Sequence, residues 1–217
     1  MRINSPIRVG GPGKVMRRWT LALALRNVAN RPETAQAIWE VQMPRIPYAE
    51  QAAPADPDIA NVTRMLAVAS PPVSKGMGDL GSAFIRGSAL PPKLRELAIL
   101  RVGYISNAIY ETWQHESLGR FVGLSEAQIA ALKAGDSGSD SLAAAERAVL
   151  AFVEDVVLNV RASDATLSAV RKHLGNAQVV DLILVTGYYM TISRLLETTG
   201  VELDAAPIDW NAFMQPQ

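Results

Sequence analysis

The sequence predicts an all-α protein. Apolar residues recur at helical spacing along most of the chain, and prolines and glycines separate these stretches. No stretch alternates between apolar and polar residues as a half-buried strand does. With 217 residues, 49% of them apolar, the chain can bury one substantial core. We therefore expect one helical domain with an appendage.

The appendage is expected at the N-terminus, where the charge differs from that of the rest. Residues 1–32 contain seven basic side chains and no acidic one, so this part carries +7 and the remainder −7. A short helix is expected at residues 19–25, and the four prolines within residues 43–57 indicate an extended linker. We interpret residues 1–42 as a basic extension, loosely ordered or with this short helix, and residues 43–217 as the domain.

The expected helices of the domain are bounded by residues that start or stop helices. Asn107, Ser125 and Ser163 are predicted N-caps, and Gly123, Gly135 and Gly200 are predicted to end helices. The helix after Pro91 and Pro92 is apolar nearly all round, which places it at the centre of the core. The expected helices span residues 58–70, 73–86, 93–104, 107–122, 125–134, 142–160, 164–174 and 177–199.

Composition excludes several classes of function. The chain has no cysteine, which excludes disulfides, thiolate metal sites and thiol redox cycling, and which fits a cytoplasmic protein. No run of 18 or more apolar residues occurs, so we expect no membrane partner. The basic residues of the extension are spread out and lack interleaved aromatics, so we expect no nucleic-acid binding.

A glutamate and a histidine lie one turn apart in the helix predicted at residues 107–122. Glu111 and His115 share one stripe with Ala108 and Leu118, and this mixed stripe is expected to face the core. Burial raises the pKa of a carboxylic acid, while its charge supports an imidazolium. The two side chains therefore form a candidate proton-transfer pair.

Glu96 adds a third polar group within the apolar helix at residues 93–104. A buried carboxylate needs a partner, and Arg95 and Arg101 are the candidates. Two other interpretations stay open, a buried network that only orients helices and a metal site of two carboxylates and one histidine. The only other histidine, His173, is expected near a helix end, where exposure to solvent and the helix dipole account for it without a functional role. With no second histidine near His115, we expect neither a metal ion nor a cofactor.

Three segments of the sequence resemble the carboxymuconolactone decarboxylase family, which shares a helical fold with alkyl hydroperoxidase D. These segments are PKLRELAILRV at residues 92–102, YETWQH at 110–115 and VGLS at 122–125. The likeness extends over about residues 43–203. It implies an alkyl hydroperoxidase D-like helical bundle, and the family's assemblies imply a homo-oligomer, a trimer or a hexamer.

The peroxidase branch of this superfamily has the signature Glu, eleven residues, Cys, two residues, Cys, three residues, His. Here the glutamate falls on Glu96 and the histidine on His115, whereas the cysteines fall on Ala108 and Glu111. The resemblance therefore implies that Glu96 and His115 correspond to the glutamate and histidine of the superfamily's proton relay, whereas its redox cysteines are missing.

These observations lead to the hypothesis of a cofactor-free lyase or isomerase that acts on a small carboxylated or lactone substrate. Glu111 and His115 are predicted to shuttle the proton, Glu96 to orient the imidazole, and Tyr110 and Trp113 to line the substrate pocket. A lactone decarboxylase is its most concrete form. The alternatives are a peroxide-stress, peroxiredoxin-like protein and a non-catalytic ligand-binding or assembly module.

Overall fold

The computed structural model describes residues 44–49 and 59–214, and this part of the chain is helical without a β-strand, as predicted. The predicted extension at residues 1–42 lies outside the described residues, as does most of the predicted linker at 43–57. The helices of the described part are α2 (Asn61–Leu66), α3 (Pro71–Gly87), α4 (Pro92–Ser106), α5 (Ile109–Phe121), α6 (Glu126–Ala134), α7 (Ala144–Asn159), α8 (Asp164–Val170), α9 (Asn176–Thr199) and α10 (Trp210–Phe213).

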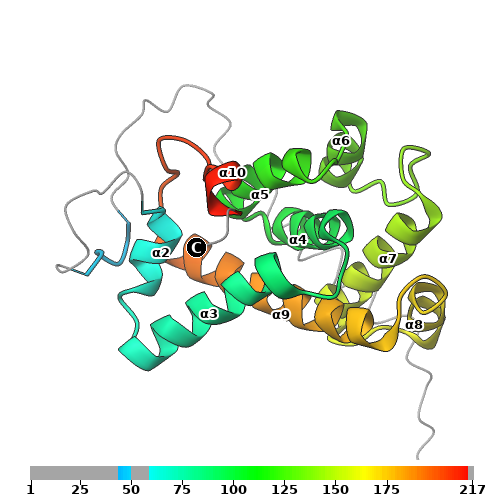
Figure 1. The fold of residues 1–217 in the computed structure, drawn as a ribbon, viewed down its shortest axis with the longest axis horizontal. Helices are drawn as coiled ribbons and strands as arrows, with labels where there is room; N and C mark the ends of the chain where they lie inside the picture. Colours follow the sequence, from blue (N-terminus) through cyan, green and yellow to red (C-terminus); the bar gives the residue numbers. More distant parts are fainter. Residues whose placement is uncertain (1–43, 50–58, 215–217) are drawn as a thin grey trace, which may run out of the picture. The chain divides into compact units, whose positions relative to one another are not determined.

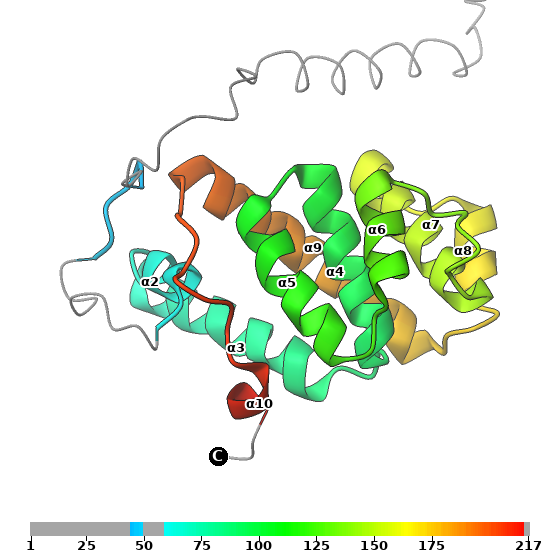
Figure 2. The same ribbon diagram turned by 90° about the horizontal axis from the view of Figure 1, so that it is seen from above.

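Helix α4 occupies the centre of the bundle, as its apolar sequence predicts. It packs against α5, α7 and α9, and these helices surround it in both views (Figures 1 and 2). Leu97, Leu100 and Val102 of α4 are completely buried. A glutamate on the same helix, Glu96, is also completely buried, so the chain carries a carboxylate into the middle of its core.

Helix α9 is long and apolar enough to cross a membrane by length and composition alone. A core helix of a globular protein passes the same test, and α9 packs against α3, α4, α5 and α7. Leu182 and Val185 belong to the largest buried cluster of the bundle. We therefore describe α9 as the second central helix.

The structure confirms several predicted helix boundaries and corrects others. Ser125 and Gln128 form the predicted capping box, and Ser163 accepts a hydrogen bond from the Thr166 backbone. Asn107 is not the N-cap of α5 but ends α4 in the left-handed region with φ 53°, a conformation that asparagine tolerates better than most residues. Helix α3 begins at Pro71, two residues before the predicted start at residue 73. Helix α2 covers only Asn61–Leu66 of the predicted range 58–70.

The segment after α9 runs past α2 and ends in α10, which the sequence did not predict (Figure 2). Asp204 fixes this segment to the bundle by accepting hydrogen bonds from the backbone of Asn61, from the Tyr110 hydroxyl and from the Gln114 amide. Trp210 then packs against the side chains of α3 and α5. The segment covers one side of the bundle and completes a cavity there.

Candidate active site

A cavity of about 500 Å³ is lined by α2, α3, α5, α9 and the C-terminal segment. Its walls are mainly apolar and include five aromatic side chains, while α3 contributes small residues. Three polar side chains of α5 reach the same space, those of Glu111, Gln114 and His115. The aromatic side chains are those of Tyr110, Tyr188, Tyr189, Trp210 and Phe213.

Four charged or ionisable side chains form a continuous row beside this cavity. Arg95 donates through Nε to Oε1 of Glu96 at 2.9 Å, and Oε2 of Glu96 lies 2.7 Å from Nδ1 of His115. Nε2 of His115 lies 3.5 Å from Oε2 of Glu111. Because Nδ1 faces a carboxylate, it carries a proton and donates to Glu96, which fixes the orientation of the ring. The row ends at the cavity with Glu111.

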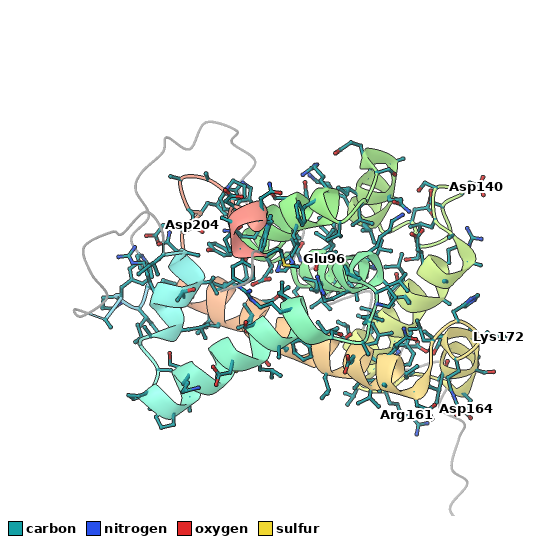
Figure 3. The ribbon with its side chains drawn as sticks, in the orientation of Figure 1. Glu96, Asp140, Arg161, Asp164, Lys172 and Asp204 are labelled. Atoms are coloured by element: carbon teal, nitrogen blue, oxygen red, sulfur yellow. The ribbon has the colours of Figure 1, made fainter. Side chains whose placement is uncertain are left out.

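Arg95 also anchors the row to the neighbouring helix. Its Nη1 donates to the backbone carbonyl oxygens of Phe84 and Ile85 near the end of α3, at 3.1 Å each. The carbonyl groups of the last turn lack partners within their own helix, so this contact satisfies groups that would otherwise be unpaired. Arg95 thereby holds Glu96 in position and joins α3 to α4. Figure 3 places Glu96 at the centre of the helices.

Burial and charge set the pKa values in this row. Burial raises the pKa of Glu111 from 4.5 to about 7, although the charge of His115 lowers it. Burial alone lowers the pKa of His115, but the charge and hydrogen bond of Glu96 and the charge of Glu111 outweigh it and raise that pKa above 6.5. Burial therefore favours the neutral acid of Glu111, whereas the two glutamates favour the charged imidazole of His115.

The structure brings most of the predicted site residues together. Glu111, His115 and Tyr110 line the cavity, and Glu96 lies directly behind His115. Trp113 is not part of the cavity lining and packs against the edge of Tyr110, with ring centroids 6.3 Å apart. At about 100° per residue, the lining residues of α5 cover one arc of the helix, and residue 113 falls outside it.

Gln114 also lines the cavity, although it was not predicted from the sequence. At about 100° per residue, position 114 lies on the same face of α5 as Tyr110 and Glu111. Oε1 of Gln114 accepts a hydrogen bond from the backbone of Ile208 at 3.0 Å, and its Nε2 donates to Asp204 at 2.8 Å. The Tyr110 hydroxyl also donates to Asp204. Both side chains therefore hold the C-terminal segment over the cavity, so their polar groups are already in use.

The described residues offer little support for a metal centre. They contain no group of three or more His, Cys, Asp or Glu side chains arranged to hold a metal ion. Both oxygens of Glu96 are already bonded, one to Arg95 and one to His115. Glu96, His115 and Glu111 therefore form a row of ionisable side chains with one end buried and one end at the cavity.

The fold is an alkyl hydroperoxidase D-like helical bundle, and its cavity holds the carboxyl group of Glu111 beside the imidazole of His115. The model of the carboxymuconolactone decarboxylase family matches residues 71–155, which include Glu96, Glu111 and His115. The predicted resemblance is thus confirmed for this part of the chain, which is similar to that family and contains no cysteine.

Solved structures show the same fold. The AhpD core of an uncharacterized peroxidase-related protein from Ralstonia eutropha superposes with a TM-score of 0.65 at 19% identity, over 75% of this chain and 93% of that one. A protein of unknown function from Agrobacterium tumefaciens gives 0.58 at 24% identity, over 63% and 94%. The debrominase Bmp8 in complex with 2,3,4-tribromopyrrole gives 0.59 at 14% identity, over 72% and 83%. A comparison with curated proteins gave no match.

Proposed function

We propose that this protein is a cofactor-free lyase or isomerase that moves a proton on a small carboxylated or lactone substrate. The observation that carries the proposal is the carboxyl group of Glu111, which lies in an apolar cavity next to His115 with a pKa of about 7. A general acid or base works best when its pKa lies near the operating pH, because both protonation states are then available.

In a decarboxylation, the bond between the substrate carbon and its carboxylate breaks, and the electron pair moves into a conjugated carbonyl group as carbon dioxide leaves. The protonated acid of Glu111 then gives its proton to the resulting enolate and regains one from solvent. In an isomerisation, the carboxylate of Glu111 instead takes a proton from one carbon and returns it to another. In both cases His115, oriented by Glu96, stabilises the carboxylate state of Glu111.

A cationic side chain in the cavity wall supports the choice of a carboxylated substrate. Arg86 of α3 lines the cavity, donates through Nη2 to the carbonyl oxygen of Phe213 at 2.6 Å and lies over the Phe213 ring. The positive charge of Arg86 in the cavity wall favours a substrate that carries a carboxylate. The aromatic walls suit a small unsaturated ring.

The test uses a panel of small unsaturated γ-lactones with and without a carboxylate, followed by ultraviolet absorbance and by carbon dioxide release. Once a substrate is turned over, His115→Ala and Glu111→Gln should each lower kcat by about 10² to 10⁴-fold. Glu116→Gln, on a partly exposed face of the same helix, is the control. Unchanged turnover in both site variants would refute the proposal, and saturable binding without turnover would favour a ligand-binding module.

Thiol-dependent peroxide reduction is not part of the proposal, because the chain has no cysteine to form a sulfenate. For the assembly we propose a cytoplasmic homo-oligomer, a trimer or a hexamer, without nucleic-acid or membrane partners. Exposed apolar side chains on the outer face of α9, among them Val180 and Leu184, support an interface between helices.

A further inference from the structure

The side chain of Tyr189 on α9 has a hydroxyl group with no partner in the protein. Tyr189 lines the cavity, and only 6% of the residue is exposed. Its hydroxyl makes no hydrogen bond within the described part of the chain, yet it is not among the polar atoms sealed from solvent without a partner. The hydroxyl therefore still has contact with the space inside the cavity, where a bound molecule can reach it.

The hydroxyl groups of the other four tyrosines of the chain all have hydrogen-bond partners. The hydroxyl of Tyr48 donates to Glu202, that of Tyr104 to Glu116 and that of Tyr110 to Asp204. The hydroxyl of Tyr188, next to Tyr189 in the sequence, donates to the carbonyl oxygen of Met77. Buried polar groups in native proteins nearly always have a partner in the protein, in water or in a bound molecule, so the Tyr189 hydroxyl is available to a ligand in the cavity.

Tyr189 lies directly beside the row of ionisable side chains. Its ring meets the His115 ring edge to face, with centroids 4.8 Å apart. Burial and the nearby charges of Glu111 and Glu96 raise the pKa of Tyr189 well above 10. The hydroxyl therefore keeps its proton throughout the pH range in which Glu111 titrates, and it can act as a hydrogen-bond donor throughout that range.

We propose that the Tyr189 hydroxyl donates a hydrogen bond to a carbonyl oxygen of the bound substrate, beside Glu111. This inference rests on the proposed function and names one more residue and one more substrate feature. The Tyr189 hydroxyl donates without carrying a charge of its own, so it suits the oxygen of a neutral carbonyl group. When electrons move into that carbonyl during the reaction, the same hydrogen bond stabilises the enolate oxygen.

The substitution Tyr189→Phe removes only the unpaired hydroxyl and leaves no unsatisfied acceptor behind. Its melting temperature should therefore equal or exceed that of the wild type. Tyr104→Phe is the matched control, because it removes a hydroxyl that is bonded to Glu116 outside the cavity. On a substrate, Tyr189→Phe should lower kcat about 10²-fold, as the loss of an oxyanion donor does, while Tyr104→Phe leaves kcat unchanged.

A binding measurement tests the same hydrogen bond without turnover. The probe is butenolide, the parent unsaturated γ-lactone, labelled with ¹³C at its carbonyl carbon and observed by infrared difference spectroscopy. Binding to the wild type and to Tyr104→Phe should shift the carbonyl stretch to lower frequency, and binding to Tyr189→Phe should not. An equal shift in all three proteins, or no saturable binding to the wild type at millimolar concentration, would overturn the inference.

The two proposals can fail separately. If butenolide shows the shift that depends on Tyr189 and no lactone is turned over, the proposed function fails while the carbonyl site stands. If Glu111→Gln abolishes turnover and Tyr189→Phe has the kcat and the carbonyl stretch of the wild type, the carbonyl site fails alone.

Discussion

Replacing Glu111 with glutamine should make the folded protein more stable at neutral and alkaline pH. The pKa of Glu111 rises from 4.5 to about 7 on folding, chiefly because burial disfavours its charged form. The folded state therefore binds the proton more tightly than the unfolded state, and the resulting stability is fully present below pH 4.5. This stability is lost progressively as the pH rises from 4.5 to about 7. Above that range the ionised Glu111 lowers the free energy of unfolding by roughly 3 kcal/mol, at about 1.4 kcal/mol per pKa unit.

Glutamine has nearly the same shape and no charge, so Glu111→Gln should escape this cost. Urea unfolding at pH 4 and at pH 8 measures it as a free-energy difference between variant and wild type, which we expect to grow by up to about 3 kcal/mol as the pH rises. Glu116→Gln on the same helix is the control and should not reproduce this growth. If Glu111→Gln is no more stable than the wild type at pH 8, the ionised carboxylate is well solvated and our account of the site is wrong.

Four further outcomes are expected. Glu96→Gln should lower the pKa of His115, followed by NMR of the imidazole, because the charge of Glu96 helps to raise it. Val160→Gly should raise the free energy of unfolding by up to about 1 kcal/mol, because Val160 has φ 69° at an exposed helix end. If the proposed homo-oligomer forms through the outer face of α9, Leu184→Lys should dissociate it, which light scattering would show as a lower mass. A chain that begins at Met43 should still melt cooperatively in calorimetry if residues 1–42 are a separate extension.

The site on α5 could be predicted because its geometry is local. Helical spacing alone places Glu111 and His115 on one inward face, and the apolar surroundings of Glu96 in the sequence demand a partner for it. The structure provides Arg95 as that partner, whereas Arg101, the other candidate, pairs with Glu154 of α7. The sequence could not decide between the two arginines, because the choice depends on which helices pack against each face of α4.

The remainder of the cavity could not be predicted because its contacts join distant parts of the chain. Asp204 bonds to Asn61 and Tyr110, more than 90 residues away in each case, and no periodic pattern marks such a contact. Helix α10 has only four residues and depends on packing against other helices, so its own sequence carries little helical signal. The same holds for Tyr189, whose place beside His115 follows from the packing of α5 against α9.

The carboxyl group at position 111 changes what the site can do. The resemblance aligns Glu111 with a redox cysteine, and its side chain lies in the cavity with His115 and Glu96 behind it. In a thiol centre, such an imidazole and carboxylate would control the ionisation of sulfur. With a carboxyl group in that place, they control the ionisation of an acid whose pKa lies near 7. Such an acid suits the proton transfer that we propose, and the Tyr189 hydroxyl is the donor that we propose for the developing negative charge on a substrate oxygen.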